Sequence, residues 1–322
     1  MIPERYANYD KIVTVAATNF AAVPGDKAAT LDKMEANIRE AASQGVDLIA
    51  FPEEALIGIE HCAVCHGGAS HCDSHHEMAE TVPGPSSERI LELAKELDIY
   101  VVFGLAERDK ERPEVLYNAA AVVGPEGIQG TYRKLHLGSL PWVSEGVTFE
   151  PGTSIPIFET RFGPIGVIIC YDFWFNPELT RLMALKGARL IVNCCGTFSG
   201  PGKRDYMVRT TATRAQENLC DTMSSNHVGG PDATSSYGAG NVDKPRAANF
   251  LGHSTIAGPS FPSFSEVYAE AGEGEQLVTA TPSFEKLHRW EHIFPWTEWR
   301  ATHQTGTSQL IPDEREKLVK GA

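Results

Sequence analysis

The chain has 322 residues, of which 42% are hydrophobic and 22% charged, and its formal net charge is -14. This composition is ordinary for a folded globular protein and excludes disorder as a general description. Acidic residues outnumber basic ones by 42 to 28, which argues against the basic footprint that nucleic acids and anionic membranes require. No apolar run approaches the ~18 residues that span a bilayer, and the first residues lack the pattern of a secretory signal. We therefore expect a cytoplasmic protein without nucleic-acid or membrane partners.

Apolar, β-branched runs and amphipathic helical stretches follow one another in the first half of the chain. Gly124–Gly127 is a turn signal between two such runs and predicts a hairpin. An apolar stripe predicts a helix that is capped by Ser86 or Ser87 and ends at Leu97. The remaining predictions are a helix over 30–43 and strands over 12–18, 46–51, 100–106, 117–123 and 128–133.

The second half continues this mixture. Phe162-Gly163 separates two short runs and predicts a second hairpin, and Asn176-Pro177 is typical of a helix start. The other predictions are a helix over 205–218 and strands over 158–161, 164–170, 189–193, 221–228, 254–257 and 276–281. Helices, hairpins and buried strands together indicate a mixed sheet in one α/β domain over 1–284. Residues 285–322 are expected to form a C-terminal extension.

Three reactive residues each follow a predicted strand. Glu53 comes after Phe51-Pro52, Lys134 after Arg133, and Cys170 after a run of aliphatic residues. Because sites in α/β folds gather at strand ends, a carboxylate, an amine and a thiol could meet there. A helix N-terminus and a lysine near Cys170 would both favour its thiolate form. Taken singly, each residue is more typical of a core position, a solvated strand end or an exposed turn than of a catalytic site.

The order of several motifs resembles the nitrilase superfamily of carbon–nitrogen hydrolases, in its amidase-like branch. The matching segments are LIAFPE (48–53), YRKLHL (132–137), GVIICYD (166–172), E-x3-F-x2-G (145–152), RAQEN (214–218) and GHS (252–254). Each is common by chance, but their order along most of the chain is specific.

The resemblance implies a catalytic triad of Glu53, Lys134 and Cys170, with Glu145 as a second glutamate that supports Lys134 and the substrate. It also implies a four-layer α-β-β-α sandwich that pairs into a homodimer or a higher homo-oligomer. Glu54 is expected to point away from the site, because neighbouring residues at a strand end face opposite sides.

The chemistry of acyl transfer explains these residue types. A cysteine thiolate adds to an amide or nitrile carbon and divides the hydrolysis into two easier steps through a thioester. Glu53 can act as acid and base, and burial beside a second carboxylate should raise the pKa of one glutamate. Lys134 and the backbone N–H of Tyr171 can stabilise the oxyanion. No cofactor is needed.

The leading hypothesis is an amidase that converts a linear carboxamide, a small-molecule substrate, to an acid and ammonia. Tyr171, Trp174 and Cys195 are the candidate substrate-binding residues, although core packing explains Trp174 and Cys195 equally well. An extra residue, Asn176, before the helix alters the family's spacing and leaves the pocket shape open. The alternatives are an N-carbamoyl amidohydrolase, a nitrilase, or a metal-binding or interaction protein on a hydrolase scaffold.

An insertion over about 58–82 is unusually rich in cysteine and histidine. This insertion offers the number and type of ligands of a structural zinc site, namely Cys62, Cys65, Cys72 and one histidine. We choose His76 as that histidine, and His66, His71 and His75 are the other candidates. Cys62 to His66 also matches a haem-attachment pattern, but such attachment needs an export signal. The third interpretation is a loop whose thiols and imidazoles face solvent or a partner subunit. None of these is required by the proposed chemistry.

Overall fold

The computed structural model describes residues 8–59, 73–140, 143–229 and 250–282, apart from positions 11 and 24, and four isolated positions beyond. The helices are α1 (Lys27–Ser43), α2 (Asp73–Met78), α3 (Pro85–Leu97), α4 (Tyr171–Phe175), α5 (Pro177–Leu185) and α6 (Lys203–Asn218), with a 3₁₀ turn, η4, at Glu145–Val147. The first strands are β1 (Val15–Phe20), β2 (Leu48–Ala50), β3 (Tyr100–Arg108), β4 (Leu116–Gly124), β5 (Gly127–Arg133), β6 (Ser139–Leu140) and β7 (Val143–Ser144). They are followed by β8 (Ile157–Phe158), β9 (Ile165–Ile169), β10 (Leu190–Cys195), β11 (Asp221–Gly229), β12 (Phe250–Leu251), β13 (Thr255–Ser260), β14 (Phe264–Glu270) and β15 (Gln276–Ala280).

One mixed sheet connects most of these strands, in the order β5-β4-β3-β2-β1-β11-β10-β9-β8. The central pairs, from β3 through β1 and β11 to β9, are parallel, and the hairpins β4–β5 and β8–β9 are antiparallel. β1 pairs with β2 along its first half, with β11 only at its last residues, and with β15 along most of its length. The sheet therefore divides at β1 into two halves that can pack face to face.

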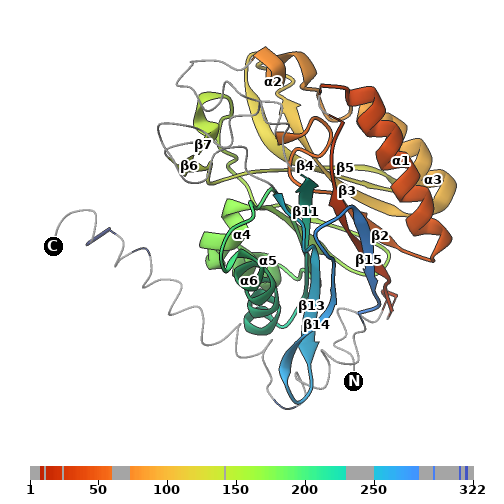
Figure 1. Ribbon diagram of the computed structural model, residues 1–322, viewed down its shortest axis with the longest axis vertical. Helices are drawn as coiled ribbons and strands as arrows, with labels where there is room; N and C mark the ends of the chain where they lie inside the picture. Colours follow the sequence, from red (N-terminus) through yellow and green to blue (C-terminus); the bar gives the residue numbers. More distant parts are fainter. Residues whose placement is uncertain are drawn as a thin grey trace.

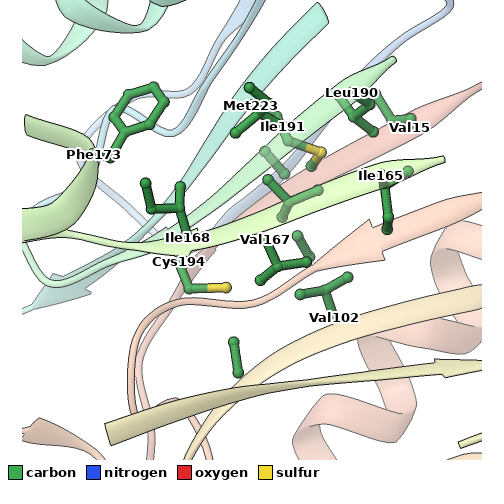
Figure 2. Packing of buried hydrophobic residues seen from close by; sticks show 14 of the residues in the cluster. Val15, Val102, Ile165, Val167, Ile168, Phe173, Leu190, Ile191, Cys194 and Met223 are labelled. Atoms are coloured by element: carbon green, nitrogen blue, oxygen red, sulfur yellow. The ribbon is translucent and has the colours of Figure 1, made fainter. Parts of the chain in front are cut away.

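Four layers result from this division. α1 and α3 lie together on one side of the molecule, α4, α5 and α6 lie on the other, and the strands lie between them (Figure 1). Side chains of β1, β2 and β3 alternate between two cores, as strand geometry requires. Val15, Leu48 and Val102 belong to the core shared with β9 and β10, which Figure 2 shows around Val167 and Ile191. The expected α-β-β-α sandwich is thus observed.

Most predicted elements are present, with shifted ends. The predicted first strand starts three residues too early, and the helix after it starts at Lys27, where Asp26 accepts a hydrogen bond from Ala29 N. The prediction that Ser86 or Ser87 caps α3 is wrong. Gly84 is the cap, because the side chain of Ser87 bonds back to Gly84 N and that of Ser86 is bound to Glu80.

No helix in the described part of the chain is both long and apolar enough to cross a membrane.

The fold brings several strand ends to one edge of the sheet. β2, β9 and β10 run parallel within it, and β5 runs in the direction of β3 because two antiparallel pairings separate them. Lys134 and Cys170 directly follow β5 and β9, and Glu53 follows β2 after two residues. The topology therefore gathers at one edge three residues that lie 36 to 117 positions apart in the sequence.

Gly104 of β3 fixes the turn that carries Glu53. Its N–H donates to Pro52 O at 3.1 Å, and its carbonyl accepts from Leu56 N at 3.1 Å. A Cβ atom at this position would lie 2.3 Å from Glu54 N and 2.4 Å from Pro52 O, both of which are backbone atoms. Only glycine allows so close an approach.

Gly104→Ala is therefore expected to lower the free energy of unfolding by about 1–3 kcal/mol, because the strand and the turn must separate. The measurement is chemical denaturation, with Gly274→Ala as the control, since a Cβ at Gly274 meets no atom within 4 Å. Equal stability of the two variants would show that the turn is not held by this contact.

Candidate active site

A lysine ammonium between two carboxylates forms the centre of the site. Lys134 Nζ lies 2.7 Å from Glu53 Oε1 and 2.7 Å from Glu145 Oε1. Lys134 and Glu53 are only 2% and 3% exposed. Burial alone would lower the pKa of Lys134, but the Glu145 and Glu53 carboxylates raise it well above its usual range. The ammonium is therefore charged at all ordinary pH values.

Neutral donors complete the coordination of both carboxylates. Asn118 Nδ2 donates to Glu53 Oε1 at 2.8 Å and to Glu145 Oε1 at 3.1 Å. Gly196 N donates to Glu53 Oε2 at 3.0 Å, and Gly138 N donates to Glu145 Oε2. Burial nevertheless raises the pKa of Glu145, and the Lys134 ammonium counteracts it. The expectation that one of two neighbouring glutamates has a raised pKa is confirmed for Glu145.

Cys170 lies at the turn between β9 and α4. Its φ is 43°, in the left-handed region that non-glycine residues seldom adopt. Its N–H is held by Asn193 Oδ1 at 2.9 Å and by Cys194 O at 3.0 Å, and its carbonyl accepts from Phe173 N and Trp174 N at 2.9 Å each. Such a backbone conformation persists only where its surroundings enforce it. The strained turn fixes the direction of the thiol.

The surroundings of Cys170 favour the thiol over the thiolate. Burial raises its pKa well above the usual range, and the Glu53 carboxylate raises it further. Lys134 lowers this pKa, as the sequence predicted, and so does the backbone N–H of Gly196. The effects of burial and Glu53 are larger, so the pKa of Cys170 is raised. The Gly196 N–H that donates to Glu53 Oε2 thus also lowers the pKa of Cys170.

Asp172 joins the turn of Cys170 to the segment that follows Lys134. Its fully buried carboxylate accepts from Tyr132 Oη at 2.7 Å, from Leu135 N at 2.9 Å, and from both N and Nδ1 of His136 at 2.9 and 2.7 Å. Asp172 therefore braces the turn of Cys170 against the segment that follows Lys134.

Glu54 points away from Lys134, as expected. It has a φ of 48° and pairs with His75 of α2, with 2.7 Å between Glu54 Oε2 and His75 Nε2. On the other side, His227 Nε2 lies 2.6 Å from the carbonyl oxygen of Glu53. His75 and His227 therefore hold the turn of Glu53 from two elements. Sequence analysis assigned no role to His227, Asn118 or Gly196, which lie within apolar or small-residue runs.

Of the candidate substrate-binding residues, Trp174 lies in an aromatic cluster beside Cys170. Its ring centroid is 4.9 Å from that of Phe173 and 5.7 Å from that of Tyr206, and its Nε1 has no hydrogen-bond partner among the described residues. Burial raises the pKa of Tyr206 to about 12, and the thiol of Cys170 contributes to this shift. Tyr206 therefore belongs to the same aromatic cluster as Trp174, and no motif in the sequence indicated it.

The other two candidates differ in their surroundings. Tyr171 is half-buried, and its ring centroid is 4.7 Å from that of Phe175. Cys195 is fully buried at the end of β10, and its thiol donates to Ser225 O at 3.3 Å. The Cys195 thiol is thus bound to the neighbouring strand.

The cysteine- and histidine-rich insertion falls mainly outside the described residues. Cys62, Cys65 and Cys72, the predicted zinc ligands, lie outside them with His66 and His71, whereas His75 and His76 belong to α2. Among the residues that the structure does describe, no group of three or more metal-ligating side chains is present. The zinc site stays a prediction.

Asp172→Asn is expected to lower the free energy of unfolding by about 2–3 kcal/mol, because its amide would present a donor where the carboxylate accepts from backbone N–H groups. The contacts of the Lys134 ammonium with the two carboxylates should loosen with it, since the segment after Lys134 loses its anchor. Thermal or chemical denaturation measures the first effect. Asp26→Asn is the matched control, because asparagine also caps a helix; if both variants lost equally little stability, the bracing role would be wrong.

Known proteins share this fold and sequence. A model of the carbon-nitrogen hydrolase family matches residues 14–292. A nitrilase of Pyrococcus abyssi (strain GE5 / Orsay) is 34% identical over 248 residues, covering 76% of this chain and 80% of the relative. An N-carbamoylputrescine amidase of Solanum lycopersicum is 31% identical over 280 residues, covering 84% of this chain and 86% of the relative. An omega-amidase NIT2 of Xenopus tropicalis is 32% identical over 260 residues, covering 78% of this chain and 81% of the relative.

A solved structure gives the same result for the fold. Saccharomyces cerevisiae Nit3, of branch 10 of the nitrilase superfamily, superposes with a TM-score of 0.70 at 24% identity, covering 89% of this chain and 96% of that one. The relatives carry three different activities in their names, so they agree on the bond type and differ on the substrate. With the family model matching most of its length, this chain belongs to the carbon-nitrogen hydrolase family, in the nitrilase superfamily.

Proposed function

We propose that this protein is an amidase that hydrolyses a linear carboxamide to a carboxylic acid and ammonia through a thioester on Cys170. Membership of the family already makes it a hydrolase of carbon–nitrogen bonds other than peptide bonds. The observation that carries the proposal is the pair of contacts from Lys134 Nζ to Glu53 and Glu145, beside a protonated thiol at a strained turn.

The first half-reaction needs a base, because the Cys170 thiol is protonated. Glu53 Oε2 takes the thiol proton while Sγ bonds to the amide carbon, and the electron pair of the C=O bond moves to oxygen. Lys134 and the backbone N–H of Tyr171 stabilise this oxyanion. When the tetrahedral intermediate collapses, the C–N bond breaks, Glu53 returns the proton to nitrogen, and ammonia leaves.

The second half-reaction uses the same groups. Glu53 takes a proton from water, whose oxygen bonds to the thioester carbon and forms a second oxyanion. Collapse breaks the C–S bond, the acid leaves, and the Cys170 sulfur recovers its proton from Glu53. Loss of one oxyanion donor of this kind costs about 3–4 kcal/mol in the transition state, so Lys134 is expected to be indispensable. Glu145 supports Lys134 and stays outside the proton transfers.

The aromatic residues beside Cys170 support an amide with an apolar or aromatic substituent. Trp174 and Tyr206 pack against each other next to the thiol, and Tyr171 packs against Phe175. Aromatic surfaces of this kind favour apolar groups. A preference for short aliphatic amides would count against this substrate class without affecting the proposed chemistry.

Wild type and Cys170→Ala are to be incubated with panels of amides, carbamoyl amines and nitriles, with ammonia as the readout. We expect turnover of amides by the wild type and a loss of at least about 1000-fold in Cys170→Ala, because the nucleophile is gone. Cys194→Ala is the control, since this buried thiol lies on the adjacent strand.

Three results would contradict the proposal. Undiminished turnover by Cys170→Ala would exclude the thioester. Turnover confined to carbamoyl amines or to nitriles would replace the amidase with one of the two related activities. No turnover on any panel would favour a binding protein on a hydrolase scaffold.

A further inference from the structure

Asn118 contacts two of the three charged groups at the centre of the site and the backbone of the third residue. It is fully buried near the start of β4, opposite Ala106 of β3. Its side-chain Nδ2 donates to Oε1 of Glu53 and to Oε1 of Glu145, at 2.8 and 3.1 Å. Its backbone carbonyl accepts from Lys134 N at 2.9 Å. The Lys134 ammonium contacts the same two carboxylate oxygens.

The orientation of the Asn118 amide follows from these neighbours. If the amide were rotated by 180°, its oxygen would face two carboxylate oxygens and repel both. With Nδ2 toward the carboxylates, Oδ1 is buried and has no hydrogen-bond partner among the described residues. An asparagine that only filled the core would be expected to satisfy its oxygen as well. The side chain is therefore arranged as a donor to the two glutamates.

The cluster needs such a donor for an electrostatic reason. Two carboxylates share one ammonium in a buried site, so they repel each other and one negative charge is left over. An amide stabilises the charged form of both carboxylates without adding a charge of its own. A second lysine would neutralise the cluster and change the field at Cys170.

We propose that Asn118 is a positioning residue that holds Glu53 and Glu145 as charged acceptors around Lys134. This inference rests on the proposed function, in which Glu53 must be ionised before it can take the thiol proton. The titratable groups that face the Asn118 amide are Glu53 after β2, Lys134 after β5 and Glu145 on η4, with Cys170 after β9 beyond them. Asn118 acts through the glutamates and does not touch the reacting atoms.

The two hydrogen bonds from Asn118 determine the direction in which the pH profile shifts when they are lost. Removing the amide removes a hydrogen bond to the charged form of each carboxylate, so the buried cluster takes up a proton at higher pH. The ascending, acidic limb of kcat/KM should therefore move to higher pH. A hydrogen bond to a charged group corresponds to about one to two pH units of such a shift.

The experiment uses Asn118→Ala and Asn118→Leu, because the second keeps the volume of the side chain while losing the donor. Two readouts are followed against pH: amide turnover as kcat/KM, and the rate at which iodoacetamide alkylates Cys170, read by mass spectrometry of its peptide. We expect the acidic midpoint of both readouts to rise by about one to two pH units in both variants.

Asn19→Ala and Asn19→Leu are the matched controls. Asn19 is also a buried strand asparagine whose Nδ2 donates to two oxygens, Gly272 O at 2.7 Å and Gly274 O at 2.9 Å, but neither belongs to the site. These controls should lose stability and keep the wild-type midpoint.

Wild-type midpoints in both Asn118 variants would overturn the inference, and so would an equal shift in the Asn19 variants. Failure of the proposed function looks different. If the wild type turned over no amide, the alkylation of Cys170 would still report the ionisation of the cluster and decide the role of Asn118.

Discussion

One ammonium between two buried carboxylates is the constraint on which the rest of the site depends. Taking three charges out of water is costly, and their mutual attraction offsets that cost only when the geometry is tight and the remaining lone pairs are satisfied. Lys134 meets both carboxylates at 2.7 Å, and backbone N–H groups from Gly196 and Gly138 donate to their outer oxygens. The cluster is therefore an arrangement in which no member can move alone.

The fold holds this cluster through the backbone. Gly104 lets β3 approach the turn of Glu53, and His227 of β11 forms a hydrogen bond with the carbonyl oxygen of Glu53. Asp172 joins the start of α4 to the segment after Lys134, so the thiol and the ammonium are positioned by one buried carboxylate. Strand ends supply the residues, and buried polar contacts between loops set their distances.

The fold and the central residues could be predicted, because apolar runs and turn signals indicate the elements and ordered motifs indicate the residues. The apolar, β-branched runs of β1 to β3 and the hairpin signal at Gly124–Gly127 predicted elements that the structure contains. Glu53, Lys134 and Cys170 were found by their motifs, and the structure brings Glu53 and Lys134 into contact. Their catalytic roles stay predictions until they are measured.

Other features could not be predicted, for physical reasons. Asn118 lies in an apolar strand, where one polar residue has no local pattern that indicates its partners. The protonated state of Cys170 is a sum of opposing effects, and only the structure shows that burial and Glu53 outweigh Lys134. The cap of α3 was misplaced because Glu80 and the backbone of Gly84 bind the two serines that the local sequence offered as caps. Contacts distant in sequence decided the first two cases, and contacts three and six residues apart decided the third.

The most direct test of the central claim is the capture of an acyl group during turnover. Hydroxylamine added to the wild-type reaction attacks a thioester and releases a hydroxamic acid in place of the carboxylic acid. If Cys170 carries the acyl group, hydroxamate should appear in proportion to hydroxylamine, the acid should fall correspondingly, and Cys170→Ala should form neither. Release of acid and ammonia with no hydroxamate at any hydroxylamine concentration would contradict the account.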